Sequence, residues 1–210
     1  MKGNNKTQLL FFLLITLAIN GNTRNINIKT ISDKTYKTEK FSKLQRIDSS
    51  TIFLRRFFRW YKTKFDSLDH HIFPVATDFK NKAPYRINFK ETEKYLSILK
   101  LSGFFSDNYI NSYRDYFRKI DLTLQKTKQN DGPVEGLDFD PIVHSQEPES
   151  ILENLNNIWL RVVKFTENEI TIKMLTPFNV DTYSLYYLKK INNKYMIDKI
   201  DFWADGKVQK

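Results

Sequence analysis

Residues 159–203 read WLRVVKFTENEITIKMLTPFNVDTYSLYYLKKINNKYMIDKIDFW, and this stretch decides the fold. Short polar links separate four apolar runs of strand length: WLRVVKF (159–165), EITIKML (169–175), YSLYYLKK (183–190) and YMIDKIDFW (195–203). Connections this short join neighbouring strands in antiparallel fashion. Asn192-Asn193 suits a tight hairpin because Asn tolerates positive φ. We therefore predict a curved, four-stranded antiparallel meander.

Three helices are predicted ahead of the sheet. They span Ser49 or Ser50 to about Asp66, Glu91–Leu101, and a segment capped by Ser106 that ends near Lys128. In each, apolar residues recur in steps of three and four, which gives one face to bury. These faces consist of Phe53, Phe57, Trp60 and Tyr61; Tyr95, Leu96 and Leu99; and Ile110, Tyr113, Phe117, Ile120 and Leu124. The predicted fold class is α+β, with N-terminal helices packed on the meander.

The N-terminal residues are typical of an export signal. Lys2 and Lys6 precede the apolar run Leu9–Ile19, which is too short to cross a bilayer as a helix. We predict a signal peptide over residues 1–21, a flexible polar spacer over 22–49 and a single α+β domain over 50–205. An uncleaved anchor is the alternative. No cysteine follows the run, so the protein is expected in the periplasm or at the cell surface, not as a lipoprotein and without a transmembrane span after cleavage.

Composition narrows the chemistry. The chain has no cysteine, which excludes disulfides, thiol catalysis and thiolate metal sites, whereas 17 Phe, 11 Tyr and 3 Trp indicate a substantial core. Residues 23–130 carry 23 basic and 11 acidic side chains, whereas residues 131–210 carry 9 basic and 13 acidic ones. Export and the lack of a recognised motif argue against nucleic acid as a partner, so the basic half is interpreted as a solvated surface.

No cofactor or metal is predicted. The phosphate-loop, dinucleotide-binding and nucleophile-elbow motifs are missing from the sequence. The only adjacent histidines are His70 and His71, whose side chains diverge and cannot bind one metal together.

The most unusual segment is DGPVEGLDFDPIVHSQEPE (131–149), which has six acidic residues, three prolines and no Lys or Arg. Its turn-forming residues predict an ordered loop, and long loops in compact domains are often functional. Asp138, Asp140, His144 and Glu147 are candidates for an acid/base pair or a site for a hard cation. Alternatively, Asp138 and Asp140 cap turns while apolar neighbours attach the loop to the core.

Asp198 is the second catalytic candidate beside His144. Strict alternation in the last strand places Met196, Asp198, Ile200 and Phe202 on one face. A carboxylate on an apolar face would have a raised pKa and could act as a general base. The alternative is an edge strand on which Asp198 reaches solvent or a lysine.

These two segments also carry a family resemblance. GLDFDPIVHSQEP (136–148) and the final strand pair resemble a family of exported bacterial proteins of unknown function, which have a nuclear transport factor-like, or cystatin-like, α+β roll. The family's Asp-x-Asp-Pro element, with Gln and an acidic residue after it, is matched by Asp138, Asp140, Pro141, Gln146 and Glu147. The resemblance implies this fold and an envelope location, adds Gln146 to the binding candidates, and supplies no catalytic residues.

Three functions are compatible with these features. The first is a non-enzymatic binding or accessory protein of the bacterial envelope, which holds a small ligand or partner in a pocket or on loop 131–149. The second is a protein-interaction module of the inhibitor or immunity type. The third is an acid/base enzyme, an isomerase or a hydrolase, with Asp198 or His144 as proton acceptor.

Overall fold

The structure is a computed structural model of the 210-residue chain that describes residues 28–72, 83–176, 179–204 and 207–208. The chain divides into two compact units, Met1–Leu44 and Gln45–Lys210. Of the first unit, only helical residues belonging to α2 (Ile28–Ile72) are described. The predicted domain, 50–205, falls within the second unit. The predicted signal peptide lies outside the described residues.

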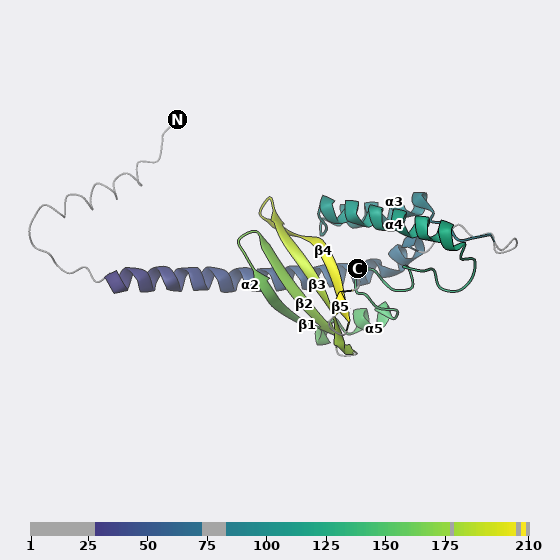
Figure 1. Ribbon diagram of the computed structural model, residues 1–210. Helices are drawn as coiled ribbons and strands as arrows, with labels where there is room; N and C mark the ends of the chain where they lie inside the picture. Colours follow the sequence, from purple (N-terminus) through teal and green to yellow (C-terminus); the bar gives the residue numbers. More distant parts are fainter. Residues whose placement is uncertain (1–27, 73–82, 177–178, 205–206, 209–210) are drawn as a thin grey trace, which may run out of the picture. The chain divides into compact units, whose positions relative to one another are not determined.

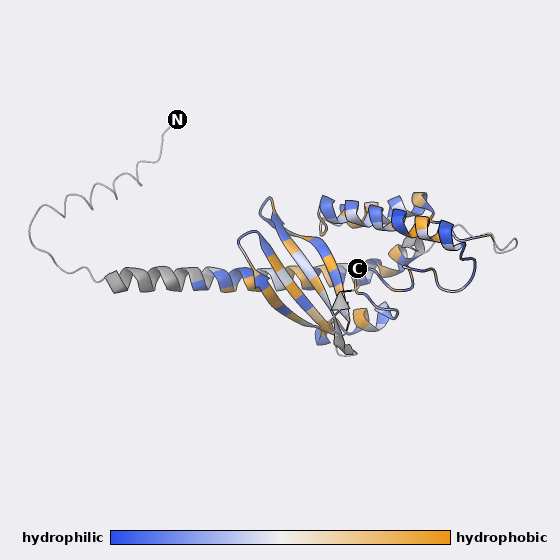
Figure 2. Cartoon of the chain, in the orientation of Figure 1, coloured by the Kyte–Doolittle hydropathy of each residue, from blue (hydrophilic) through white to orange (hydrophobic). Residues whose placement is uncertain are grey.

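The sheet confirms the predicted meander. Its strands follow one another in sequence order, every neighbouring pair is antiparallel, and a two-residue strand extends the last edge. The strands are β1 (Trp159–Phe165), β2 (Glu169–Thr176), β3 (Asn179–Ile191), β4 (Lys194–Ala204) and β5 (Lys207–Val208). Asn192 and Asn193, which join β3 to β4, both have positive φ, at 50° and 62°. Hydrophilic and hydrophobic residues alternate along the strands (Figure 2).

The described residues contain four helices and a short 3₁₀ turn besides the sheet. Besides α2, they are α3 (Phe89–Leu101), α4 (Asp107–Thr127), α5 (Pro148–Glu153) and the turn Leu155–Asn157. The bounds of α3 and α4 agree with the prediction to within two residues. Ser106 caps α4 as expected, since its hydroxyl oxygen accepts a hydrogen bond from the backbone N–H of Tyr109.

The predicted start of the first helix is wrong. Ser49 and Ser50 lie inside α2, and their hydroxyls donate to the carbonyl oxygens of Gln45 and Ile47 instead of capping a helix. A serine that bonds back to the preceding turn is compatible with a helix interior. The helical segment therefore includes much of the predicted spacer.

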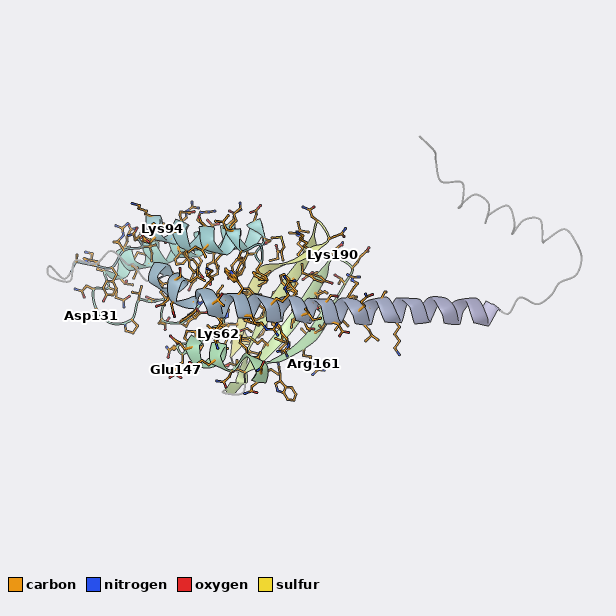
Figure 3. The ribbon with its side chains drawn as sticks, turned by 180° about the vertical axis from the view of Figure 1, so that it is seen from behind. Lys62, Lys94, Asp131, Glu147, Arg161 and Lys190 are labelled. Atoms are coloured by element: carbon orange, nitrogen blue, oxygen red, sulfur yellow. The ribbon has the colours of Figure 1, made fainter. Side chains whose placement is uncertain are left out.

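One face of α2 forms the centre of the core. Leu54, Phe57, Phe58, Tyr61, Phe65 and Leu68 are all buried. The ring of Phe58 meets Tyr186 of β3 edge-on, with centroids 5.4 Å apart. The part of α2 that belongs to the second unit crosses one face of the sheet, in front of it in Figure 3 and behind it in Figure 1. This helix therefore covers the sheet face that carries Ile170, Ile172 and Met174, which are all buried.

A β-bulge corrects the predicted pattern of the last strand. Tyr187 pairs with Lys199 but Leu188 pairs with Ile197, so Asp198 is the extra residue. Ile197 is consequently buried and lies on the same face as the partly buried Ile200 and Phe202, whereas Met196 belongs to the other face. The backbone of Ile197 also bonds to the α3–α4 connection, donating to Phe104 O at 2.7 Å and accepting from Ser106 N at 3.0 Å.

The packing of α2 predicts the effect of a substitution at Phe57. Its side chain is fully buried and meets Phe105 edge-on at 5.3 Å. We expect Phe57→Ala to lower the free energy of unfolding by about 3–5 kcal/mol, because it leaves a cavity in the core. Ile52→Ala on the same helix, where the residue is 58% exposed, should cost about 0.5 kcal/mol. Urea unfolding of both variants checks this, and equal losses would contradict the packing described.

Candidate functional site

A tight turn around Asp140 organises loop 131–149. One carboxylate oxygen, Oδ1, accepts the backbone N–H groups of Ile142 at 2.9 Å and Val143 at 2.8 Å. The backbone N–H of Asp140 donates to Ser145 O at 2.8 Å, and its carbonyl oxygen accepts from His144 N at 2.8 Å. The Asp-Pro sequence thus forms the compact turn that its residue types predict.

Four tyrosine hydroxyls fasten this loop to the helices and the sheet. Tyr61 of α2 donates to Asp140 Oδ2 at 2.5 Å. The other three donate to backbone carbonyl oxygens: Tyr113 to Pro141 at 3.0 Å, Tyr186 to Ile142 at 2.7 Å, and Tyr116 to Gly136. Because these donors come from α2, α4 and β3, the loop is fixed against three elements at once.

Asp140 therefore caps a turn, which is the alternative role that the sequence left open. Its side chain is buried, and this burial raises the pKa of the carboxyl to about 6, although the bonds from Tyr61 and the turn amides act in the opposite direction. Its hydrogen bonds go to the protein's own groups. Asp138 is exposed and lines neither of the two cavities described below.

His144 has an unusual backbone conformation and packs against two aromatic rings. Its backbone φ is +52°, an uncommon value for a residue other than glycine. Its ring stacks between Phe202, at a centroid distance of 5.2 Å, and Phe139, at 5.9 Å. Its Nδ1 atom is buried and has no hydrogen-bond partner among the described residues. Burial lowers the pKa of His144 to about 4, so the imidazole is neutral at pH 7.

Cavities lie on both sides of His144. The larger, of about 750 Å³, lies between α4, loop 131–149 and β4, and we call it the α4–β4 cleft. Its aromatic wall consists of Tyr109, Tyr113, Tyr116, Phe139, His144 and Phe202. The smaller cavity, of about 350 Å³, is lined by His144, Phe202, Gln146 and Glu147 together with hydroxyl-bearing residues of α5, β2 and β3.

The structure thus brings together only part of the predicted set. His144 borders both cavities, Gln146 and Glu147 reach the smaller one, and Asp198 reaches the cleft. Asp198 Oδ1 accepts the hydroxyl hydrogen of Ser106 at 2.6 Å, and Oδ2 accepts from Asn108 Nδ2 at 3.3 Å. Its carboxylate therefore supports the start of α4, where a negative charge is also favoured by the helix dipole.

The sequence did not identify the tyrosines of α4 as a cleft wall. The sequence spacing places Tyr113 on the stripe that is predicted to be buried, and Tyr109 and Tyr116 stand beside it. The rings of Tyr109 and Tyr113 stack at 4.9 Å, and both border the cleft. The sequence did contain a signal for this wall. The aromatic stripe of α4 is wider than the face that one helix needs for packing, so its outer residues must contact something other than the sheet.

Two features are missing from the part of the chain that the structure describes. Among the described residues, no group of three or more His, Cys, Asp or Glu side chains is close enough together to bind a metal ion. The side chains of His70 and His71 lie outside the described residues. No described helix is both long enough and apolar enough to cross a membrane.

No family model matches the chain, and neither does any curated protein or solved structure. The resemblance to an exported family therefore stays a prediction.

The bond between Tyr61 and Asp140 is expected to contribute measurably to stability. Tyr61→Phe removes the donor from a buried carboxylate, so the free energy of unfolding should fall by about 1–3 kcal/mol. Tyr95→Phe is a matched control, because the buried Tyr95 hydroxyl has no partner among the described residues. Urea unfolding of Tyr61→Phe, Asp140→Asn and the double variant should show coupling between the two sites. Additive losses would mean that this bond does not stabilise the fold.

His144 and Asp140 should give stability opposite dependences on pH. The folded-state pKa of His144, about 4, lies below its ordinary value of 6.5, so its contribution is complete above pH 6.5 and is lost as the pH falls toward 4. The folded-state pKa of Asp140 is raised from 3.8 to about 6, so its contribution is present at low pH and is lost as the pH rises through this range.

Substitution separates the two effects. When the pH falls from 6.5 to 4, the His144→Asn variant should lose less stability than the parent protein, and the Asp140→Asn variant should lose more. For His144→Asn the difference should be on the order of 1–2 kcal/mol, a modest value because the ring is only partly enclosed. Asn suits the positive φ at position 144. Urea unfolding from pH 4 to 7 measures both slopes, and other carboxyl groups cancel because all three proteins share them. Parallel slopes for the parent and His144→Asn would refute the buried, neutral histidine.

Proposed function

We propose that this chain is an exported, non-enzymatic binding protein of the bacterial envelope, which holds a small, partly apolar molecule in the α4–β4 cleft. The observation that carries the proposal is the cleft itself, a space of about 750 Å³ with an aromatic wall. Ligand sites in proteins are typically concave, mostly apolar and of this size.

The residues around the cleft define the chemistry of its ligand. Tyr113, Phe139 and Phe202, which are partly exposed, offer ring surface for an apolar or planar group. Asn108, Glu135 and Asp198 add polar groups from three different segments. A molecule with an apolar body and a hydrogen-bonding or cationic end matches this distribution.

The attachment of the loop supports binding by a preformed site. The carbonyl oxygens of Gly136 and Pro141 are held by Tyr116 and Tyr113, two residues that also line the cleft. The same side chains therefore position the loop and form the wall. A site held rigid in this way loses little conformational entropy when it binds a ligand.

Hydrogen bonding favours binding over acid/base catalysis. Asp198 accepts from Ser106 and Asn108, and Asp140 accepts from Tyr61 and two turn amides. Both carboxylates are thus engaged with the protein's own donors. His144 remains as a neutral ring between two phenylalanines, well suited to contact an apolar ligand.

The proposals that the protein is exported and that it belongs to a particular fold family are based on the sequence. The positive start and short apolar run over residues 1–21 support a signal peptide, and the missing cysteine supports an unlipidated protein of the periplasm or cell surface. The antiparallel meander with helices on one face is compatible with a nuclear transport factor-like, or cystatin-like, roll.

A bulky residue at Ser112 tests the cleft. Ser112 is exposed on α4 and lines the cleft, so Ser112→Trp should fill the cleft without disturbing the core. Ser97→Trp, at an exposed serine of α3 outside the lining of the cleft, is the matched control. Ligand-observed NMR with indole and tyramine as probes should show saturable binding that Ser112→Trp weakens at least about tenfold and Ser97→Trp leaves within about twofold.

Two outcomes would contradict the proposed binding site. If neither probe saturates on the parent protein, or if both tryptophan variants bind equally well, the cleft is not a binding site for this class of molecule. Thermal unfolding of the two variants confirms that they remain folded.

A further inference from the structure

The face of the sheet turned away from α2 carries a different set of residues. Strand register places Arg161, Lys173, Leu185 and Asp201 in one row across this face, and Lys164, Thr171, Tyr187 and Lys199 in the next. Trp159, Tyr183 and Trp203 lie on the same side of their strands. Figure 1 views the sheet from this side, with α2 behind it. We call this surface the outer sheet face.

Aromatic rings and cations interleave on the outer sheet face. Trp159 is 75% exposed, and the rings of Tyr183 and Trp203 stack at 6.2 Å. Lys173 Nζ lies 3.5 Å from the ring centroid of Tyr183, and Lys199 Nζ lies 5.2 Å from that of Tyr187. Such cation–π contacts hold the ammonium groups over the sheet surface.

Two of the cations form an unfavourable pair. Arg161 and Lys173 are directly opposite each other on β1 and β2, and like charges in this position destabilise a sheet. The neighbouring carboxylates are already engaged, since Glu169 pairs with Lys164 at 3.1 Å and Asp201 with Lys199 at 2.7 Å. Among the described residues, no carboxylate forms an ion pair with Arg161 or Lys173. An external anion would relieve this repulsion.

We propose that the outer sheet face binds an acidic polysaccharide. Arg161 and Lys173 would pair with successive carboxylate groups of the polymer, since arginine binds carboxylates through two parallel hydrogen bonds. The open ring of Trp159, two residues from Arg161 on the same strand, offers a flat apolar surface to the C–H face of a sugar. The charge is complementary to such a chain, and the rows of alternating strands give an extended path for it.

Single-stranded nucleic acid fits the outer sheet face less well. Binding of that kind uses a series of open aromatic faces on which successive bases stack. Here Lys173 already lies over the ring of Tyr183, and Lys199 over that of Tyr187. A uronic acid polymer needs spaced cations and one exposed ring, which is what this surface provides.

The test compares two charge reversals that change net charge equally. Arg161→Glu/Lys173→Glu alters the outer sheet face, whereas Arg56→Glu/Lys62→Glu alters two exposed residues of α2. Isothermal titration calorimetry with alginate oligomers should show saturable binding to the full parent chain that weakens as salt rises. The outer-face pair should lower affinity at least about tenfold and the α2 pair by less than about twofold, because only the former removes direct ion pairs.

Trp159→Ala separates stacking from charge. It should weaken alginate binding several-fold, because the exposed ring is lost while every cation is retained. Neutral dextran should not bind any of the proteins. Urea unfolding checks that each variant stays folded, and none of the altered residues lines the α4–β4 cleft.

Several results would overturn the proposal. These are the absence of alginate binding, equal losses from both charge reversals, and tighter binding of a dT20 oligonucleotide that depends on the same residues. A concentration-dependent dimer abolished by Arg161→Glu/Lys173→Glu would instead identify the outer sheet face as an interface between copies. Binding of indole in the α4–β4 cleft is measured in a separate experiment, so the proposed cleft site and the proposed polysaccharide surface can each be refuted without affecting the other.

Discussion

The buried carboxylate of Asp140 is the point on which the arrangement depends. A charged group in the interior is costly unless donors surround it. Here three donors do so: the Tyr61 hydroxyl and the N–H groups of Ile142 and Val143. Because Tyr61 belongs to α2 and the turn amides to the loop, one side chain sets where the loop meets the helix that crosses the sheet. His144 and both neighbouring cavities are positioned as a consequence.

The sequence predicted the strands well because their signals are local. Alternation along β2, short links and Asn192-Asn193 each report on residues a few positions apart. The errors arose where a local pattern has two structural outcomes. Ser49 resembled a helix cap, but its hydroxyl bonds to the preceding turn. In β4 both Met196 and Ile197 are apolar, so alternation alone could not show which of them is buried.

The loop that carries the candidate site could be singled out from the sequence, but the roles of its residues could not. The composition of loop 131–149 indicated an ordered, unusual segment, and His144 does lie between two cavities. Nothing in the loop itself distinguishes Asp140, which is buried, from Asp138, which is exposed. The distinction depends on Tyr61, which is 79 residues away in the sequence. Roles that depend on partners this distant require the tertiary structure.

The bulge at Asp198 links the two proposed surfaces. Strand side chains alternate between faces, so one extra residue reverses the orientation of every side chain that follows it. Without the bulge, and with Ile197 still buried, Lys199 and Asp201 would face the helices while Ile200 and Phe202 would face outward. The core would then contain two charges, and His144 would lose the ring of Phe202 on which it stacks. The aromatic cleft and the charged outer sheet face thus require the same single insertion, which Ser106 and Asn108 stabilise through the Asp198 carboxylate.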